Sequence, residues 1–115
     1  MADKVVIHRK AARDLIAVNE VVAITLDLVD CGIENETIII ATGISTPVHL
    51  LTDAISTILK AAPRRIFRET GCRHLYDTSK LKRLVNVPDF DESYPVTILN
   101  RYVPQIHSTC VTKDR

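Results

Sequence analysis

The sequence has 115 residues, of which 46% are hydrophobic and 25% charged, so it is long and apolar enough to form one domain. Only 4% of the residues are aromatic, so we predict an aliphatic core. Its net charge of +1 at pH 7 excludes a strongly basic or strongly acidic protein and by itself indicates no partner. No apolar run approaches the roughly 20 residues that cross a bilayer, so we expect no membrane association.

The first third of the chain predicts a strand, a long helix and a second strand. Residues 4–8 (KVVIH) are typical of a short strand, and residues 11–29 lack Gly and Pro and follow a helical period. Apolar residues flank the main stripe of this helix, so we expect burial on more than one side, by its own sheet and by a partner subunit. The stripe consists of Leu15, Val18, Val22, Leu26 and Val29. After Cys31-Gly32, the β-branched run at 37–40 predicts a buried strand.

A glycine turn joins that strand to a second helix. Gly43 breaks the apolar run, Thr46 and Pro47 are typical of a helix start, and Pro63 ends the helix. A glycine turn that leads into a helix N-terminus can hold an anion. The simpler alternative, a tight connection without a ligand, is the more common use of such turns.

The remainder of the chain predicts two strands around a long loop. Residues 64–70 resemble a strand that Gly71 interrupts and that residues 74–76 continue past a bulge. Residues 77–93 predict a polar loop, residues 94–99 a last strand, and residues 104–115 a mobile tail. We therefore predict one domain at 1–103 with the order β-α-β-α-β-β. Its fold class is α+β, a two-layer sandwich with two helices on one face of a four-stranded mixed sheet.

Charge is unevenly distributed along the sequence. Residues 1–13 hold four bases and one acid, and residues 63–88 hold seven bases and two acids. Between them, residues 14–62 hold seven acids and one base. Two basic blocks thus flank an acidic middle, which matters for anionic partners.

This order of elements resembles the Alba superfamily of small nucleic-acid-binding proteins, which includes small subunits of ribonuclease P and MRP. In that family a basic pair follows the first strand, as Arg9 and Lys10 do here, and a glycine turn precedes the second helix, as Gly43 does here. The family's basic hairpin arm corresponds to residues 64–99. Some of its members also carry Arg beside the turn glycine, whereas Thr42 and Ile44 stand here.

The resemblance and the two basic blocks predict nucleic-acid binding, to RNA rather than DNA, mainly through phosphate contacts of a homodimer or a heterodimer with a similar subunit. Tyr76 is placed to stack on a base. The alternatives are a solvated charged face, or a scaffold subunit of a ribonucleoprotein with little nucleic-acid affinity. The expected binding residues are Arg9, Lys10, Arg13, Gly43, Arg64, Arg65, Arg68, Arg73, His74, Tyr76, Lys80, Lys82 and Arg83.

Other chemistry has little support in the sequence. The four histidines and three cysteines share no metal-ligand spacing, and no set of polar residues suggests a catalytic constellation. We therefore expect no metal, no cofactor and no enzymatic activity. No leader-like segment precedes the first strand and no CxxC pair is present, so we expect reduced thiols in a cytoplasmic or nuclear protein.

Overall fold

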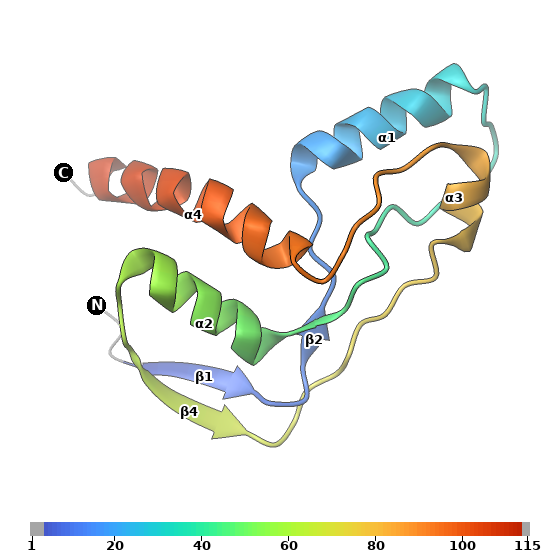
Figure 1. The fold of residues 1–115 in the computed structure, drawn as a ribbon. Helices are drawn as coiled ribbons and strands as arrows, with labels where there is room; N and C mark the ends of the chain where they lie inside the picture. The colour runs from blue at the N-terminus through green and yellow to red at the C-terminus, as the bar shows by residue number, and fades with distance from the viewer. Residues whose placement is uncertain (1–3, 114–115) are drawn as a thin grey trace.

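A computed structural model describes residues 4–113, and the side chains of residues 4–107. The chain is an α+β protein with four helices and four short strands (Figure 1). In chain order the elements are β1 (Lys4–His8), β2 (Ala12–Arg13), α1 (Val18–Asp30), β3 (Thr46–Pro47), α2 (Val48–Leu59), β4 (Arg64–Arg68), α3 (Ser79–Leu84) and α4 (Tyr94–Lys113).

The strands form two separate pairs. β1 and β4 are parallel, with Lys4 opposite Arg64 and His8 opposite Arg68. β2 and β3 are antiparallel and only two residues long. The prediction of one four-stranded mixed sheet is therefore wrong for the described residues. So is the hairpin arm at 64–99, because β4 pairs with the first strand rather than with a later one.

α2 lies between the β1–β4 pair and α4, so helices cover one face of this pair (Figure 1). Thr46 and Pro47 precede α2 as expected, but they also form β3, and Pro47 is the residue before the helix. The Val48 N–H donates to the carbonyl of Ala11 at 3.0 Å, which fixes the helix start against the residues after β1.

α1 packs through a different side from the one predicted. Ile24 and Leu28 are buried and form a cluster with Leu81 and Val85 of the α3 region. The predicted stripe is instead mostly in solvent: Val18 is 71%, Val22 52%, Leu26 58% and Val29 67% exposed. Periodicity showed that α1 is apolar on more than one side. It could not show which side is buried within the chain, because contact with the α3 region decides that.

The last predicted strand, residues 94–99, is the start of α4. The Asp91 carboxylate accepts the Ser93 N–H at 2.9 Å, and the Asp91 carbonyl accepts the Tyr94 N–H at 3.1 Å. Pro95 lies in the first turn, where a missing N–H costs nothing. α4 then continues to Lys113, so the predicted boundary after residue 103 falls inside a helix, and residues 114–115 of the predicted tail lie outside the described residues.

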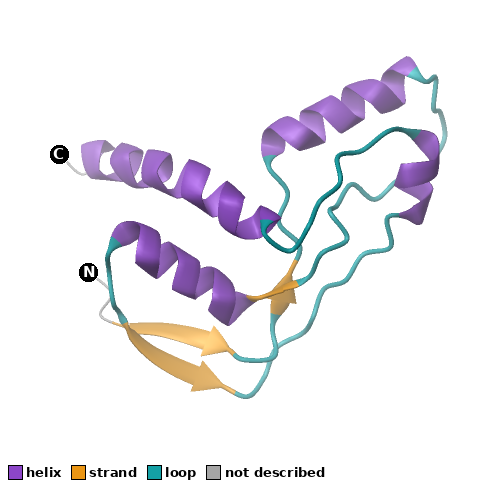
Figure 2. Cartoon of the chain, in the orientation of Figure 1, coloured by secondary structure: helices purple, strands orange, loops and turns teal. Residues whose placement is uncertain are grey.

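The prediction of a strand at 37–40 is wrong: these residues form neither helix nor strand and pair with no strand in the part of the chain that the structure describes. They belong to one of several long loops that connect the α1–α3 end of the molecule to the strands (Figure 2). The radius of gyration is 16.9 Å, against about 13 Å for a compact domain of this length. The chain is thus more open than a domain of its size usually is.

The two faces of α1 give a direct test of the fold. Ile24→Ala removes a side chain that is 2% exposed, so we expect it to lower the free energy of unfolding by about 2–4 kcal/mol. Leu26→Ala, on the 58% exposed face, should change it by less than about 0.5 kcal/mol. Urea unfolding followed by circular dichroism measures both, and equal losses would contradict this packing.

Candidate functional site

The glycine turn before α2 is held by Asp14. One oxygen of the Asp14 carboxylate accepts the Thr42 N–H at 3.0 Å and the Thr42 hydroxyl at 2.7 Å, and the other accepts the Gly43 N–H at 2.8 Å. Gly43 has φ of +81°, and a Cβ atom there would approach the Thr78 hydroxyl oxygen to 3.3 Å. The Gly43 amide is therefore occupied by a carboxylate of the same chain and is not free for an external anion.

A pocket of about 460 Å³ opens beside this turn. We call it the turn pocket; it is lined by residues 43–47, Leu50, Arg73, Leu75 and Glu92. The Ser45 hydroxyl oxygen is buried and has no hydrogen-bond partner among the described residues. A buried hydroxyl without a partner costs free energy, so a polar ligand that reaches Ser45 would relieve this cost. The pocket volume lies within the range of small-molecule sites.

Arg73 is placed at the turn pocket by its backbone. Ala12 and Arg73 form an isolated parallel β-bridge. In it the Ala12 N–H donates to the Cys72 carbonyl at 3.2 Å, and the His74 N–H donates to the Ala12 carbonyl at 2.9 Å. The Arg13 side chain also donates to the Cys72 carbonyl, at 2.6 Å. Within residues 4–107, the Arg73 guanidinium forms no ion pair. A positive charge is thus held at the pocket with its donors available.

A second basic surface follows from the pairing of β1 with β4. We call it the ribbon face; it consists of Lys4, Val6, His8, Arg64, Ile66 and Arg68, which are neighbours in the parallel register. Successive strand residues point to opposite sides, so these six share the side away from Ile7, which is 1% exposed. Lys4, Arg64 and Arg68 form no ion pair with any described residue. The pairing therefore brings parts of the two basic blocks together.

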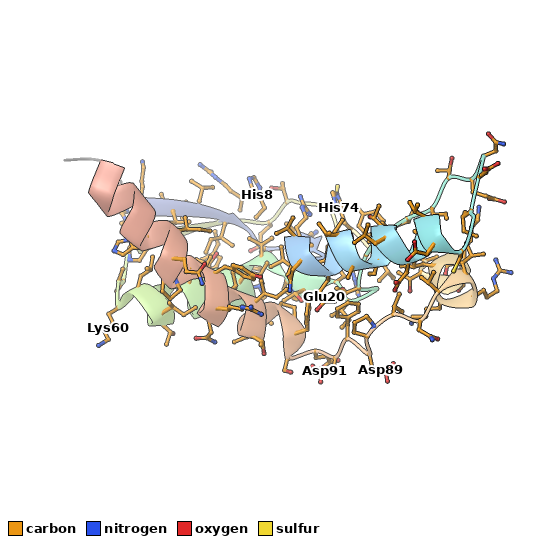
Figure 3. The ribbon with its side chains drawn as sticks, turned by 90° about the horizontal axis from the view of Figure 1, so that it is seen from above. His8, Glu20, Lys60, His74, Asp89 and Asp91 are labelled. Carbon is orange, nitrogen blue, oxygen red and sulfur yellow. The ribbon has the colours of Figure 1, made fainter. Side chains whose placement is uncertain are left out.

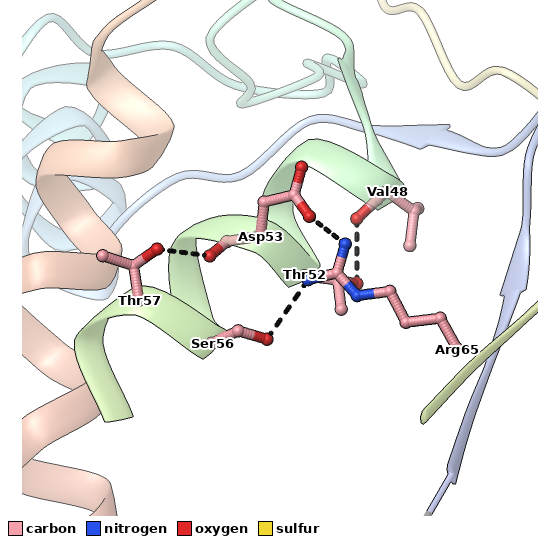
Figure 4. A network of polar contacts seen from close by, with 6 residues as sticks. All are labelled: Val48, Thr52, Asp53, Ser56, Thr57 and Arg65. Atoms are coloured by element: carbon pink, nitrogen blue, oxygen red, sulfur yellow. Dashed lines mark hydrogen bonds and ion pairs between the residues drawn. The ribbon is translucent and has the colours of Figure 1, made fainter. Parts of the chain in front are cut away.

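Several of the predicted binding residues already have partners. Arg9 donates to Glu69 at 2.8 Å and lies over the Phe67 ring at 4.3 Å. Arg65 reaches from β4 to α2, where it contacts Asp53 and Ser56 (Figure 4). Both ends of these ion pairs are partly exposed, so each stabilises the fold only slightly. They nevertheless make Arg9 and Arg65 less available to a ligand.

The bases of α3 lie apart from those of the strands. Lys80 contacts Glu36, and this contact holds the pKa of the Glu36 carboxyl below its usual value. Lys82 and Arg83 line an open pocket of about 380 Å³ together with Asp27 and Asp30 at the end of α1. The predicted set of thirteen residues is therefore divided between distant parts of the fold rather than gathered on one surface.

His74 and Tyr76 lie between these groups, in the loop before α3. Their rings form an edge-on pair with centroids 6.4 Å apart, and Tyr76 is 40% exposed. Figure 3 places His8 and His74 at one edge of the molecule and Asp89 and Asp91 at the opposite edge. The acidic residues of the loop before α4 thus lie on the side away from the two histidines.

Some residues of these sites were not expected from the sequence. Asp14 and Ser45 were missed because their roles depend on contacts with residues far along the chain or on burial. Asp77 and Asp91 did have a local signal, since each precedes a serine by two residues at a helix start. The Ser79 hydroxyl and N–H keep the pKa of Asp77 below its usual value, and those of Ser93 do the same for the pKa of Asp91.

Residues 4–107 contain no group of three or more His, Cys, Asp or Glu side chains close enough to hold a metal ion. Among the described helices, none is long and apolar enough to cross a bilayer.

Comparison with known proteins gives a likeness of fold. No protein family matches the sequence, and no curated protein matches it. Among solved structures, RMD from Pseudomonas aeruginosa, complexed with NADPH, matches 88% of this chain with a TM-score of 0.64 and 13% identity. The similar region is 35% of the RMD chain. The chain is thus an α+β protein that is similar in fold to about one third of a longer protein.

The hold of Asp14 on the turn can be tested by substitution. Asp14→Asn keeps the shape but replaces one acceptor oxygen by a donor that faces an N–H, so we expect it to lower the free energy of unfolding by about 1–3 kcal/mol. Asp89→Asn, on an exposed carboxylate, should change it by less than about 0.5 kcal/mol. Urea unfolding measures both, and an Asp14→Asn protein as stable as wild type would show that the turn does not need this carboxylate.

Proposed function

We propose that the chain binds a phosphate-bearing small molecule of the nucleotide type in the turn pocket. The observation that carries this proposal is the guanidinium of Arg73, free of any ion pair within the described residues, at a pocket with a buried Ser45 hydroxyl that has no partner. Arg side chains bind phosphate through strong charge-assisted hydrogen bonds. Ser45 supplies a further donor for a phosphate or ribose oxygen.

Two further features support an anionic ligand. α2 begins at Val48 without a side-chain cap, so the positive end of a twelve-residue helix lies beside the pocket. The similar fold in RMD was solved with NADPH, which carries several phosphates. The three glycines of this chain, at positions 32, 43 and 71, form no G-x-G-x-x-G motif. The proposal is therefore for one phosphate-bearing part of a ligand, without a complete dinucleotide site in this chain.

Titration with NADPH, ADP and inorganic pyrophosphate, followed by amide chemical shifts, tests the turn pocket. We expect shifts at Ser45 and Arg73, and Arg73→Gln should weaken binding about tenfold or more because a charge-assisted hydrogen bond is lost. The matched control is Arg64→Gln, an exposed arginine on the ribbon face, which should bind as wild type does. Unchanged affinity in Arg73→Gln, or no shifts at the pocket with any of the three ligands, would refute this function.

As a second candidate we propose nucleic-acid binding, to RNA rather than DNA, on the ribbon face. The observation that favours it is the register that sets Lys4 beside Arg64 and His8 beside Arg68. Such a row of cations suits phosphate contacts that carry little sequence information. The Alba-like arrangement and the pairing with a second or similar subunit belong to this proposal. A scaffold subunit with little nucleic-acid affinity remains its alternative, and neither reading requires catalysis.

Filter binding of a 30-nucleotide oligo(U) RNA at several salt concentrations tests the second candidate. The triple variant Lys4→Gln, Arg64→Gln, Arg68→Gln should bind more weakly and lower the salt slope by about two to three contacts. The control pair Lys82→Gln, Arg83→Gln, at the other end of the fold, should bind as wild type does. An equal loss in both variants would indicate unspecific attraction, and no salt-dependent binding by the wild type would favour the scaffold alternative.

A further inference from the structure

The turn pocket holds one basic and one acidic side chain that do not pair with each other. Arg73 and Glu92 both line it, yet within residues 4–107 no ion pair joins them. Figure 3 shows their chain neighbours, His74 and Asp91, at opposite edges of the molecule. The two charges therefore reach the pocket from opposite sides, and each is left for a ligand that lies between them.

Glu92 is held in place by the turn before α4. The Asp91 carboxylate accepts the Ser93 N–H at 2.9 Å, and the Asp91 carbonyl accepts the Tyr94 N–H at 3.1 Å. Glu92 lies inside this hydrogen-bonded turn, so its backbone is fixed although its side chain is exposed. The backbone of Arg73 is fixed by its bridge to the start of the chain. Little ordering of the backbone is therefore needed at either charge when a ligand binds.

The Glu92 carboxylate limits what can lie at its side of the pocket. An ionised carboxylate accepts hydrogen bonds but donates none, and it repels a phosphate. Among the described residues, Glu92 forms no ion pair that would neutralise it. The phosphate of a ligand therefore belongs beside Arg73, and the group beside Glu92 must be a hydrogen-bond donor.

Apolar side chains form part of the remaining wall. Leu50 of α2 is 47% exposed, Leu75 of the loop before α3 is 62% exposed, and both line the pocket together with Ile44. Small-molecule sites combine such apolar surface with a few polar groups that fix the orientation of the ligand. A ribose is polar on every side, whereas a nucleobase has two flat faces that suit an apolar wall. The base of a nucleotide thus fits this part of the pocket, with the donor on its edge.

We infer that the turn pocket selects nucleotides whose base carries an exocyclic amino group, because Glu92 accepts a hydrogen bond from that group while Arg73 binds the phosphate. Carboxylates accept hydrogen bonds from amino groups of bases in this way. Adenine, cytosine and guanine have such a group, and uracil, thymine and hypoxanthine do not. The inference rests on the function proposed above and adds to it the class of base and the residue that selects it.

Two nucleotides that differ only in the amino group test this inference. AMP and purine riboside 5′-monophosphate share the phosphate, the ribose and the ring, but the second has hydrogen in place of the amino group at C6. Each is titrated into the ¹⁵N-labelled full chain, and the amide shifts of the residues that line the pocket give its dissociation constant. We expect the wild type to bind AMP about tenfold or more tightly, because the second nucleotide lacks the hydrogen bond to a charged acceptor.

Substitutions of Glu92 assign that preference to one residue. Glu92→Ala removes the acceptor, so the two nucleotides should bind within about twofold of each other. This variant should bind purine riboside 5′-monophosphate at least as tightly as the wild type does, because the carboxylate no longer repels the phosphate. Glu92→Gln keeps an acceptor oxygen without its charge, so its preference should be intermediate, at about threefold. The matched control is Asp89→Ala, in the same loop but outside the pocket, which should keep the wild-type preference.

The failure of this inference is distinguishable from the failure of the proposed function. Equal binding of both nucleotides by the wild type, with Arg73→Gln weakening both, would overturn the inference and leave the proposed function standing. A preference for AMP that persists in Glu92→Ala would do the same. Weaker binding of 2′,3′-dideoxy-AMP than of AMP that disappears in Glu92→Ala, without any effect of the amino group, would assign Glu92 to the ribose hydroxyls instead. If neither nucleotide nor inorganic pyrophosphate binds at the pocket, the proposed function fails as well.

Discussion

β1 and β4 pair in parallel although sixty residues separate their partners. Two parallel strands need a crossover connection, and here it comprises everything from Arg9 to Pro63. α2 returns the chain to the start of β4, and Arg65 of β4 contacts Asp53 and Ser56 of α2 (Figure 4). Both candidate surfaces depend on this pairing. It forms the ribbon face directly. The two segments that follow the strands, residues 9–12 and residues 69–74, hydrogen-bond to each other and so set Arg73 beside the turn pocket.

The elements with local signals were the ones that sequence could predict. The two strands β1 and β4 begin where short apolar runs predicted them. α2 begins directly after Thr46 and Pro47, which predicted a helix start. The helix at 94–99 was wrongly predicted as a strand because Val96, Thr97 and Ile98 favour strands. Asp91 and Ser93, which hydrogen-bond to each other just before α4, were a helix-start signal in the sequence. We instead interpreted the acidic residues around them as part of a solvated loop.

The candidate site was harder to predict, because counting Lys and Arg along the sequence does not show which of them form ion pairs within the fold. Whether Arg9, Arg65 or Lys80 is available depends on Glu69, Asp53 and Glu36, which approach them only in the folded chain. The same holds for the turn at Gly43, where the anion turned out to be Asp14, twenty-nine residues earlier. The sequence could thus indicate that the basic segments matter, but only tertiary structure separates Arg73 and the ribbon face from bases that already hold the fold together.

The exposed stripe of α1 bears on whether the chain pairs with itself. An apolar helix face predicted a homodimer or a heterodimer, and hydrophobic burial alone does not distinguish them. With about 3.6 residues per helical turn, Glu20 and Asp27 lie on the side of α1 away from the exposed Val22 and Leu26. Their charges would therefore not face each other across a contact made by the stripe. The stripe itself is apolar, so any complementary apolar surface could cover it, whether it belongs to a second copy or to a different protein.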